Sequence, residues 1–85
     1  MRTFKYKITD SMGIHARPAG ILVKEAKKYA SSITITKDDK STDIKRLMML
    51  MGMGIKHGDE VIVSIEGEDE ELAAAELEIF FKENL

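Results

Sequence analysis

Apolar and polar residues alternate in three segments of the chain, which is the pattern of half-buried β-strands. These segments are residues 4–8, 33–36 and 61–66. A fourth, short strand is expected over residues 41–44, because the Lys-Asp-Asp-Lys sequence at 37–40 is a turn signal. The outer face of the sheet is expected to consist of the polar members of these strands, Lys5, Lys7, Thr34 and Thr36.

A second set of segments has apolar residues at helical spacing. Over residues 16 to about 29 they recur every three or four positions, and Pro18 fits only the first turn, where its missing N–H costs nothing. This helix therefore begins directly after His15. Residues 47–51 contain strong helix formers and no β-branched residue, which predicts a short helix. A third helix follows Asp69, whose carboxylate we expect to cap it.

The expected elements follow one another in the order β-α-β-β-α-β-α. Hairpins and long crossovers favour an α+β architecture, with a mainly antiparallel sheet in one layer and helices on one of its faces. Residues 1–85 are expected to form a single domain, since this length suits one small hydrophobic core.

The composition is that of an ordinary globular protein, with 33% charged and 44% apolar residues. The chain has no cysteine, which excludes disulfides and thiolate metal sites. His57 is expected to be a surface residue of a turn, so two histidines give no metal site. The basic N-terminus lacks the apolar run of a secretory signal, and the apolar residues 47–55 are too few for a bilayer, which takes roughly 20. We expect no metal, no cofactor and no membrane insertion.

The charges are unevenly distributed along the chain. Residues 1–45 carry ten Lys or Arg and five Asp or Glu, whereas residues 46–85 carry three and ten. The basic half contains residues 12–19 (Met-Gly-Ile-His-Ala-Arg-Pro-Ala), so an acidic partner or an anionic substrate near this segment is favoured. A nucleic-acid partner is not expected, because the chain is acidic overall and has no basic stripe interleaved with aromatic residues.

His15 and Arg17 stand at a helix start, where the backbone brings its own chemistry. Unpaired N–H groups and the positive end of the helix dipole disfavour an imidazolium there, so the ring should be uncharged and nucleophilic. The same groups bind phosphate, and the Arg17 guanidinium can bind phosphate oxygens in pairs. The pattern points to a phosphoryl-carrying His15, with Ala16 and Arg17 binding the phosphate. On spacing alone, a capping or exposed loop histidine explains His15 at least as well, and a solvated first-turn arginine explains Arg17 better.

A family resemblance is carried by Gly13-Ile14-His15-Ala16-Arg17-Pro18-Ala19. This segment resembles the active-site signature of HPr, the histidine-containing phosphocarrier protein of the bacterial phosphoenolpyruvate:sugar phosphotransferase system. The resemblance runs the length of the chain. It includes Leu22-Val23, Ala26, Ile33, Ile35, Lys45, Leu50, Gly54-Ile55-Lys56, Gly58 and Gly67-Glu68-Asp69-Glu70.

The resemblance implies an open-faced β-sandwich, in which three helices cover one face of four antiparallel strands. It implies that His15 accepts a phosphoryl group on Nδ1 from phosphorylated enzyme I and passes it to the IIA domains of sugar permeases. Arg17 would be its electrostatic partner. Such a protein is a carrier rather than a turnover enzyme by itself. We expect a cytoplasmic monomer.

Four of the six methionines fall in residues 48–53. Core filling is the ordinary role of methionine, but a short helix that is apolar all round cannot bury every side, so some of its side chains should be exposed for partners. The resemblance agrees, because HPr docks through this helix and the residues around its histidine. The predicted partner surface consists of Met12, Lys24, Lys27, Lys45, Leu47, Met48 and Met51. For any single lysine, a solvated surface charge is the better interpretation.

The chain departs from the family at position 46. HPr proteins usually have a serine there, which a regulatory kinase phosphorylates in many Gram-positive bacteria, whereas this chain has Arg46. An arginine accepts no phosphate, and its cation opposes the helix dipole at a cost of a few tenths of a kcal/mol. Seryl regulation, and the binding of a catabolite-control repressor that depends on it, are therefore not expected.

Two alternatives keep the fold and change the function. An HPr-like regulatory module that acts by docking alone would not need the ring of His15, so the histidine argues against it. A nitrogen-type regulatory branch and a dihydroxyacetone-kinase relay use the same chemistry as the sugar system, and both stay open.

Overall fold

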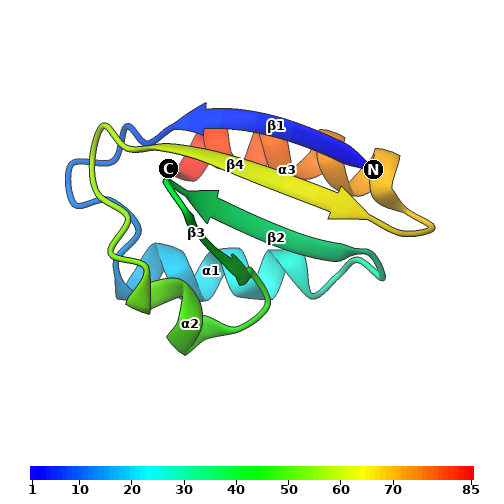
Figure 1. Cartoon of the computed structure of the whole chain (residues 1–85), viewed down its shortest axis with the longest axis horizontal. Helices are drawn as coiled ribbons and strands as arrows, with labels where there is room; N and C mark the ends of the chain where they lie inside the picture. The colour runs from blue at the N-terminus through cyan, green and yellow to red at the C-terminus, as the bar shows by residue number, and fades with distance from the viewer.

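The chain folds into a four-stranded antiparallel sheet with three helices on one face (Figure 1). The computed structural model describes residues 1–85. Its elements are β1 (Arg2–Lys7), α1 (Ala16–Ala26), β2 (Ser32–Lys37), β3 (Lys40–Asp43), α2 (Leu47–Gly52), β4 (Glu60–Glu66) and α3 (Glu70–Asn84). Their order and types confirm the α+β open-faced sandwich predicted from the sequence.

The strand order in the sheet is β1-β4-β2-β3, so β1 and β3 are its edges. β4 pairs with both β1 and β2. Along β4, Val61, Val63 and Ile65 are buried whereas Ile62 is exposed, which is the period of two that a sheet with one covered face imposes. The residues predicted for the outer face are exposed or half-buried, as expected: Lys5, Lys7, Thr34 and Thr36.

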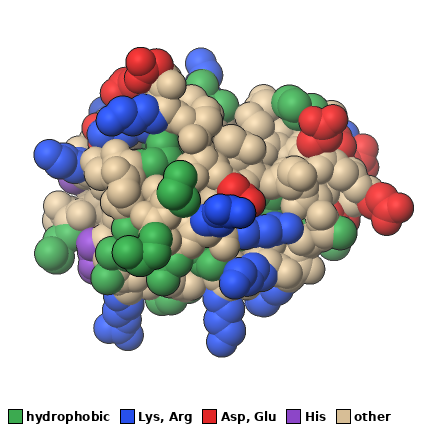
Figure 2. All heavy atoms as spheres, turned by 60° about the horizontal axis from the view of Figure 1, so that its bottom comes forward, with side chains coloured by type: hydrophobic (Ala, Val, Ile, Leu, Met, Phe, Trp, Pro, Cys, Tyr) green, Lys and Arg blue, Asp and Glu red, His purple; other side chains and the backbone are tan.

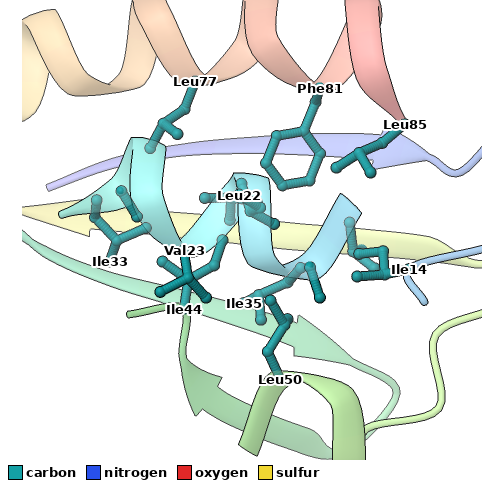
Figure 3. Packing of buried hydrophobic residues seen from close by; sticks show 14 of the residues in the cluster. Ile14, Leu22, Val23, Ile33, Ile35, Ile44, Leu50, Leu77, Phe81 and Leu85 are labelled. Atoms are coloured by element: carbon teal, nitrogen blue, oxygen red, sulfur yellow. The ribbon is translucent and has the colours of Figure 1, made fainter. Parts of the chain in front are cut away.

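A cluster of 18 buried hydrophobic residues joins the helices to the sheet. Figure 3 shows side chains from α1, α2, α3 and β2 packed together in this cluster. The ring of Phe81 on α3 meets Phe4 and Tyr6 of β1 edge-on, with centroid distances of 5.4 and 5.6 Å. Leu50 is the one fully buried residue of α2, and it anchors this short helix to the core.

α1 ends earlier than the periodicity predicts, at Ala26 rather than at about Tyr29. The N–H groups of Lys28 and Tyr29 donate to the carbonyls of Glu25 (3.1 Å) and Ala26 (3.2 Å), three residues back, which is the tighter 3₁₀ pattern. The Lys45 ammonium donates to the Tyr29 carbonyl at 2.8 Å. A residue distant in sequence therefore helps to shape this helix end.

The prediction that the Asp69 side chain caps α3 is wrong. Asp69 is the N-cap residue, but its carboxylate makes no capping hydrogen bond. It accepts instead the N–H groups of Ala30 (2.9 Å) and Ser31 (3.0 Å) and the Ser31 hydroxyl. The Asp69 carboxylate therefore binds three donors of the α1–β2 loop rather than the first amides of α3. It links this loop to the start of α3.

The pH dependence of folding should report this contact. The Ser31 hydroxyl and the N–H groups of Ala30 and Ser31 hold the pKa of Asp69 below its ordinary value of 3.8. Because the folded pKa is the lower one, the carboxylate contributes stability above pH 3.8, and the contribution is lost as the pH falls through the folded pKa. Asp69→Asn should therefore lower the urea midpoint near neutral pH and change it little in strong acid.

The control for this prediction is Glu83→Gln, which alters an exposed carboxylate near the end of α3. It should leave the urea midpoints at neutral pH and in strong acid close to those of the unaltered chain. An equal loss of stability for Asp69→Asn at neutral pH and in strong acid would contradict the assignment, since it would show that the charge of the carboxylate is not what matters.

Candidate functional site

His15 is the N-cap residue of α1. Its backbone is extended (φ −98°, ψ −171°), and its carbonyl accepts the N–H of Ala19 at 2.9 Å. The side chain is half-buried and makes no capping hydrogen bond. The interpretation of His15 as a capping histidine is therefore wrong, and its ring is not used to begin the helix.

The loop before His15 packs against the segment that follows α2. Gly13 has a φ of +68°, and a Cβ at this position would fall on the Ile55 carbonyl oxygen and 2.6 Å from the Cα of Lys56. The Ile14 N–H donates to the same carbonyl at 3.0 Å, and the Ile14 side chain is buried. The backbone that carries His15 is thus fixed on residues 55–56.

An ion pair secures that supporting segment. The ammonium of Lys37 lies 2.8 Å from the carboxylate of Asp59 and donates to the Gly54 carbonyl at 3.2 Å. Asp59 also accepts the Lys56 N–H at 2.7 Å. The Lys37 hydrogen bond first, and then that of Lys56, hold the pKa of Asp59 below its ordinary value. Sequence reasoning missed this pair, because each member alone resembles an ordinary surface charge.

Two backbone amides remain without a helical partner at the start of α1. Pro18 has no N–H, and Ala19 donates to the His15 carbonyl, which leaves the amides of Ala16 and Arg17. Both residues are exposed, and the first turn contains no acidic side chain. A helix start with free amides and an arginine in its first turn has the chemistry that suits an oxyanion, and His15 is the residue that directly precedes it.

An exposed apolar surface lies next to this helix start. The exposed fractions are 79% for Met48 and 69% for Met12, and Leu47 and Met51 are exposed as well. Figure 2 shows apolar side chains gathered over α2, with a histidine at their edge and lysine and arginine side chains around them. The prediction that α2 exposes part of its apolar surface is confirmed.

The predicted cations around this surface differ in their environments. Lys24 and Lys27 are exposed on α1 and at its end. Lys45 is half-buried, and its ammonium donates to the carbonyls of Tyr29 (2.8 Å) and Ser31 (2.9 Å). The Lys45 ammonium is therefore used in hydrogen bonds within the fold. Arg46 is the exposed N-cap residue of α2 and makes no capping hydrogen bond.

A hollow of about 440 Å³ lies between β3 and α2. Its lining residues are Lys40, Ser41, Thr42, Met48, Met49, Gly52 and Met53. Met48 is the one predicted site residue among them, and the hollow does not include His15 or Arg17. No group of three or more His, Cys, Asp or Glu side chains is arranged to hold a metal ion anywhere in the chain.

A comparison with known protein families identifies the family of this chain. The family model described as the PTS HPr component phosphorylation site matches residues 2–83. The chain belongs to the HPr family. The match covers the whole sheet and all but the last residue of α3, so it confirms the resemblance that residues 13–19 carry.

Relatives and solved structures agree with this assignment. The phosphocarrier protein HPr of Mycoplasma capricolum is 44% identical over 73 residues, which cover 86% of this chain and 82% of the relative. The crystal structure of an HPr from Thermoanaerobacter tengcongensis has a TM-score of 0.94 at 36% identity and covers 99% of this chain and 94% of that one. The chain is a phosphocarrier of the phosphotransferase system, and its partners are other members of that phosphoryl relay.

One similar structure is a dimer formed by domain swapping. It is the Bacillus subtilis catabolite-repression protein Crh, with a TM-score of 0.78 at 33% identity, covering 100% of this chain and 98% of that one. A domain-swapped dimer is therefore one form in which a protein of this fold occurs. None of the three helices of this chain is long and apolar enough to cross a membrane.

Proposed function

We propose that this HPr protein carries its phosphoryl group on His15, receives it from phosphorylated enzyme I and passes it to the IIA domains of sugar permeases. One observation carries the proposal. The half-buried side chain of His15 is not used in capping, and the two exposed residues that follow it have backbone amides without helical partners. A surface of exposed apolar residues lies next to it.

The chemistry is a transfer between two imidazoles. A nitrogen of His15 attacks the phosphorus as the bond from phosphorus to the donor nitrogen breaks, and the reverse sequence delivers the group to the next carrier. Such a transfer needs positioning and neutralisation of charge more than acid–base catalysis. The positioning comes from Gly13 and Ile14, whose backbone packs on residues 55–56.

The phosphoryl group brings a charge of about −1.5 to −2 to the start of α1. The amides of Ala16 and Arg17 and the Arg17 guanidinium provide donors for its oxygens. Because Ala16 and Arg17 are exposed, the phosphoryl oxygens also stay in contact with water, which keeps binding moderate. Moderate binding suits a carrier, which has to release the group to the next partner.

The docking face of this proposal consists of Met12, Leu47, Met48 and Met51, with the cations of Lys24 and Lys27 at its rim. Adaptable methionines suit a surface that fits several different partners in turn. Lys45 belongs to the proposal only as a support, because its ammonium bonds two carbonyls of the fold. We propose that the chain acts as a monomer, so that one face meets one partner at a time.

The test is a labelling experiment with purified enzyme I and phosphoenolpyruvate. The chain should accept one phosphoryl group, labile in acid and stable in base, and mass spectrometry should place it on His15. Addition of a panel of IIA domains, with nitrogen-type and dihydroxyacetone-kinase acceptors beside them, should discharge the group to the sugar-type domains. An absence of labelling would support a docking module and contradict the proposal.

Removal of the arginine should slow transfer without unfolding the chain. Arg17→Ala deletes a charge-assisted contact to the phosphoryl oxygens, and the transfer rate should fall by about tenfold to a hundredfold. Arg17→Lys keeps the charge and loses the bidentate geometry, so its transfer rate should lie between that of Arg17→Ala and that of the unaltered chain. The measurement is the initial rate of labelling by enzyme I, with the melting temperature as a check of folding.

Arg2→Ala is the matched control for Arg17→Ala. Arg2 is an exposed arginine of β1 paired with Glu71 of α3, and Figure 1 shows β1 on the opposite side of the molecule from α1. Its removal should leave the labelling rate unchanged. Equal effects of the two substitutions would show that only the overall charge of the chain matters, and the specific role of Arg17 would then be wrong.

A further inference from the structure

Half of the sulfur atoms of this chain lie on one surface. The sequence has six methionines and no cysteine, so the only oxidisable sulfurs are thioethers. None of the six is among the 18 buried core residues. Three of them, Met12, Met48 and Met51, lie on the docking face, with exposed fractions of 69%, 79% and 37%.

We propose that Met48 and Met12 form an oxidation site that controls docking. Peroxide converts their thioethers to sulfoxides, which weakens the docking of phosphotransferase partners, and methionine sulfoxide reductases restore it. This inference rests on the proposed function, because it concerns the face through which the phosphoryl group is exchanged.

The chemical step balances with hydrogen peroxide as the oxidant. A lone pair of the thioether sulfur attacks one peroxide oxygen, a sulfur–oxygen bond forms and the oxygen–oxygen bond breaks. The second oxygen leaves as water after a proton shift. The sulfur is oxidised by two electrons, and the peroxide is reduced by the same two.

The sulfoxide changes docking because it is polar where the thioether is apolar. An interface that buries it removes water from the new oxygen, and an apolar counter-surface offers that oxygen no donor. The fold is not affected in the same way. α2 is held to the core by Leu50, while the Met48 side chain is largely in solvent. Oxidation should therefore weaken partner binding while the chain remains folded.

The chain contains its own control for this effect. Met1 is 71% exposed, similar to Met12, and should oxidise comparably. Its terminal amine pairs with Glu70 of α3 at 2.8 Å, and Figure 1 shows the N-terminus at the opposite end of the molecule from α2. Sulfoxide at Met1 should have no effect on transfer. Met49 gives a second control, since it is 55% exposed on the same helix but lies outside the docking face as defined.

The experiment treats the full chain with hydrogen peroxide and maps each sulfoxide by peptide mass spectrometry. Phosphoryl transfer from enzyme I is then measured over a range of chain concentrations. The KM should rise about tenfold, as expected for one polar group buried without a partner, while kcat and the melting temperature stay unchanged. Sulfoxide reductases A and B together should return the KM to its starting value.

Variants locate the effect, and each is compared with its own unoxidised form. Met51→Leu is included in both chains compared, because Met51 is the third thioether of the docking face and is partly exposed. In that background the double variant Met12→Leu and Met48→Leu should keep its KM on oxidation, although its Met1 still becomes a sulfoxide. Met49→Leu should lose affinity on oxidation as the unaltered chain does.

Two results would overturn the inference alone. One is an unchanged KM with Met12 and Met48 fully oxidised, and the other is a KM that rises only together with a fall in melting temperature. Failure of the unoxidised chain to become labelled on His15 would count against the proposed function and, with it, against this inference.

Discussion

Replacement of His15 by alanine should abolish phosphoryl labelling completely, since Ala16, Arg17 and Pro18 in the first turn of α1 have no nucleophilic side chain. The fold should survive, because the His15 ring is half-buried, caps no helix and lies outside the core cluster. The measurement is the stoichiometry of label after incubation with enzyme I and phosphoenolpyruvate. The urea midpoint of the variant should stay close to that of the unaltered chain.

His57→Ala is the control, because it removes the only other imidazole. His57 is exposed, and its Nδ1 lies 3.2 Å from the Thr9 carbonyl. Its loss should leave one phosphoryl group per chain. Label that persists in His15→Ala and disappears in His57→Ala would move the carrier to the other ring and refute the assignment of His15.

The largest effect on stability near the site should come from Gly13→Ala. A φ of +68° costs a residue with a Cβ about 1–2 kcal/mol, and overpacking against the backbone of Ile55 and Lys56 adds about 1–3 kcal/mol. The free energy of unfolding should therefore fall by about 2–5 kcal/mol. Transfer should slow as well, by up to about a hundredfold, because the displaced loop carries His15 with it. Urea denaturation and the labelling rate measure the two effects.

Gly54→Ala separates strain from collision. Gly54 has a similar φ of +63°, but no heavy atom lies within 4 Å of the position its Cβ would occupy. This variant should lose only the conformational cost of about 1–2 kcal/mol and keep its transfer rate. If the two variants had equal stabilities and equal rates, the contact of Gly13 with residues 55–56 would not be what positions the site.

The elements of this fold could be predicted because each has a pattern within its own residues. The alternation in β4 and the helical stripe of α1 reflect which face each element buries, and that face imposes its period on the sequence. Pro18 fixed the start of α1 to within a residue of its observed position, because proline is tolerated only in a first turn.

The helix ends were less predictable, because contacts with distant segments of the chain determine them. The apolar stripe of α1 continues past Ala26, but the last turn is tightened where Lys45 bonds the Tyr29 carbonyl. Asp69 has the residue type and the position of a helix cap, and yet Ser31 and Ala30 offer it more donors. In both cases a hydrogen bond to a distant segment of the chain replaces the arrangement that the neighbouring residues favour.

The candidate site divides in the same way. The sequence places His15 and Arg17 at a helix start and predicts exposed methionines on α2, because a short helix that is apolar all round cannot be buried on every side. The sequence contains no comparable signal for the support of the site. From the sequence, Gly13 is indistinguishable from any loop glycine, and only the structure shows the Ile55 carbonyl packed against it. Lys37 likewise resembles an ordinary surface charge, and only the structure shows Asp59 at 2.8 Å.

By itself, the sequence determined the seven elements, the covered face of the sheet and the chemistry available at the start of α1. These follow from residues a few positions apart, where periodicity and helix-start preferences act. Only the tertiary structure decided which charged side chains serve the fold, as Lys45 and Asp69 do, and which remain at the surface for partners. That choice depends on distances between segments far apart in the chain, and no local pattern records such distances.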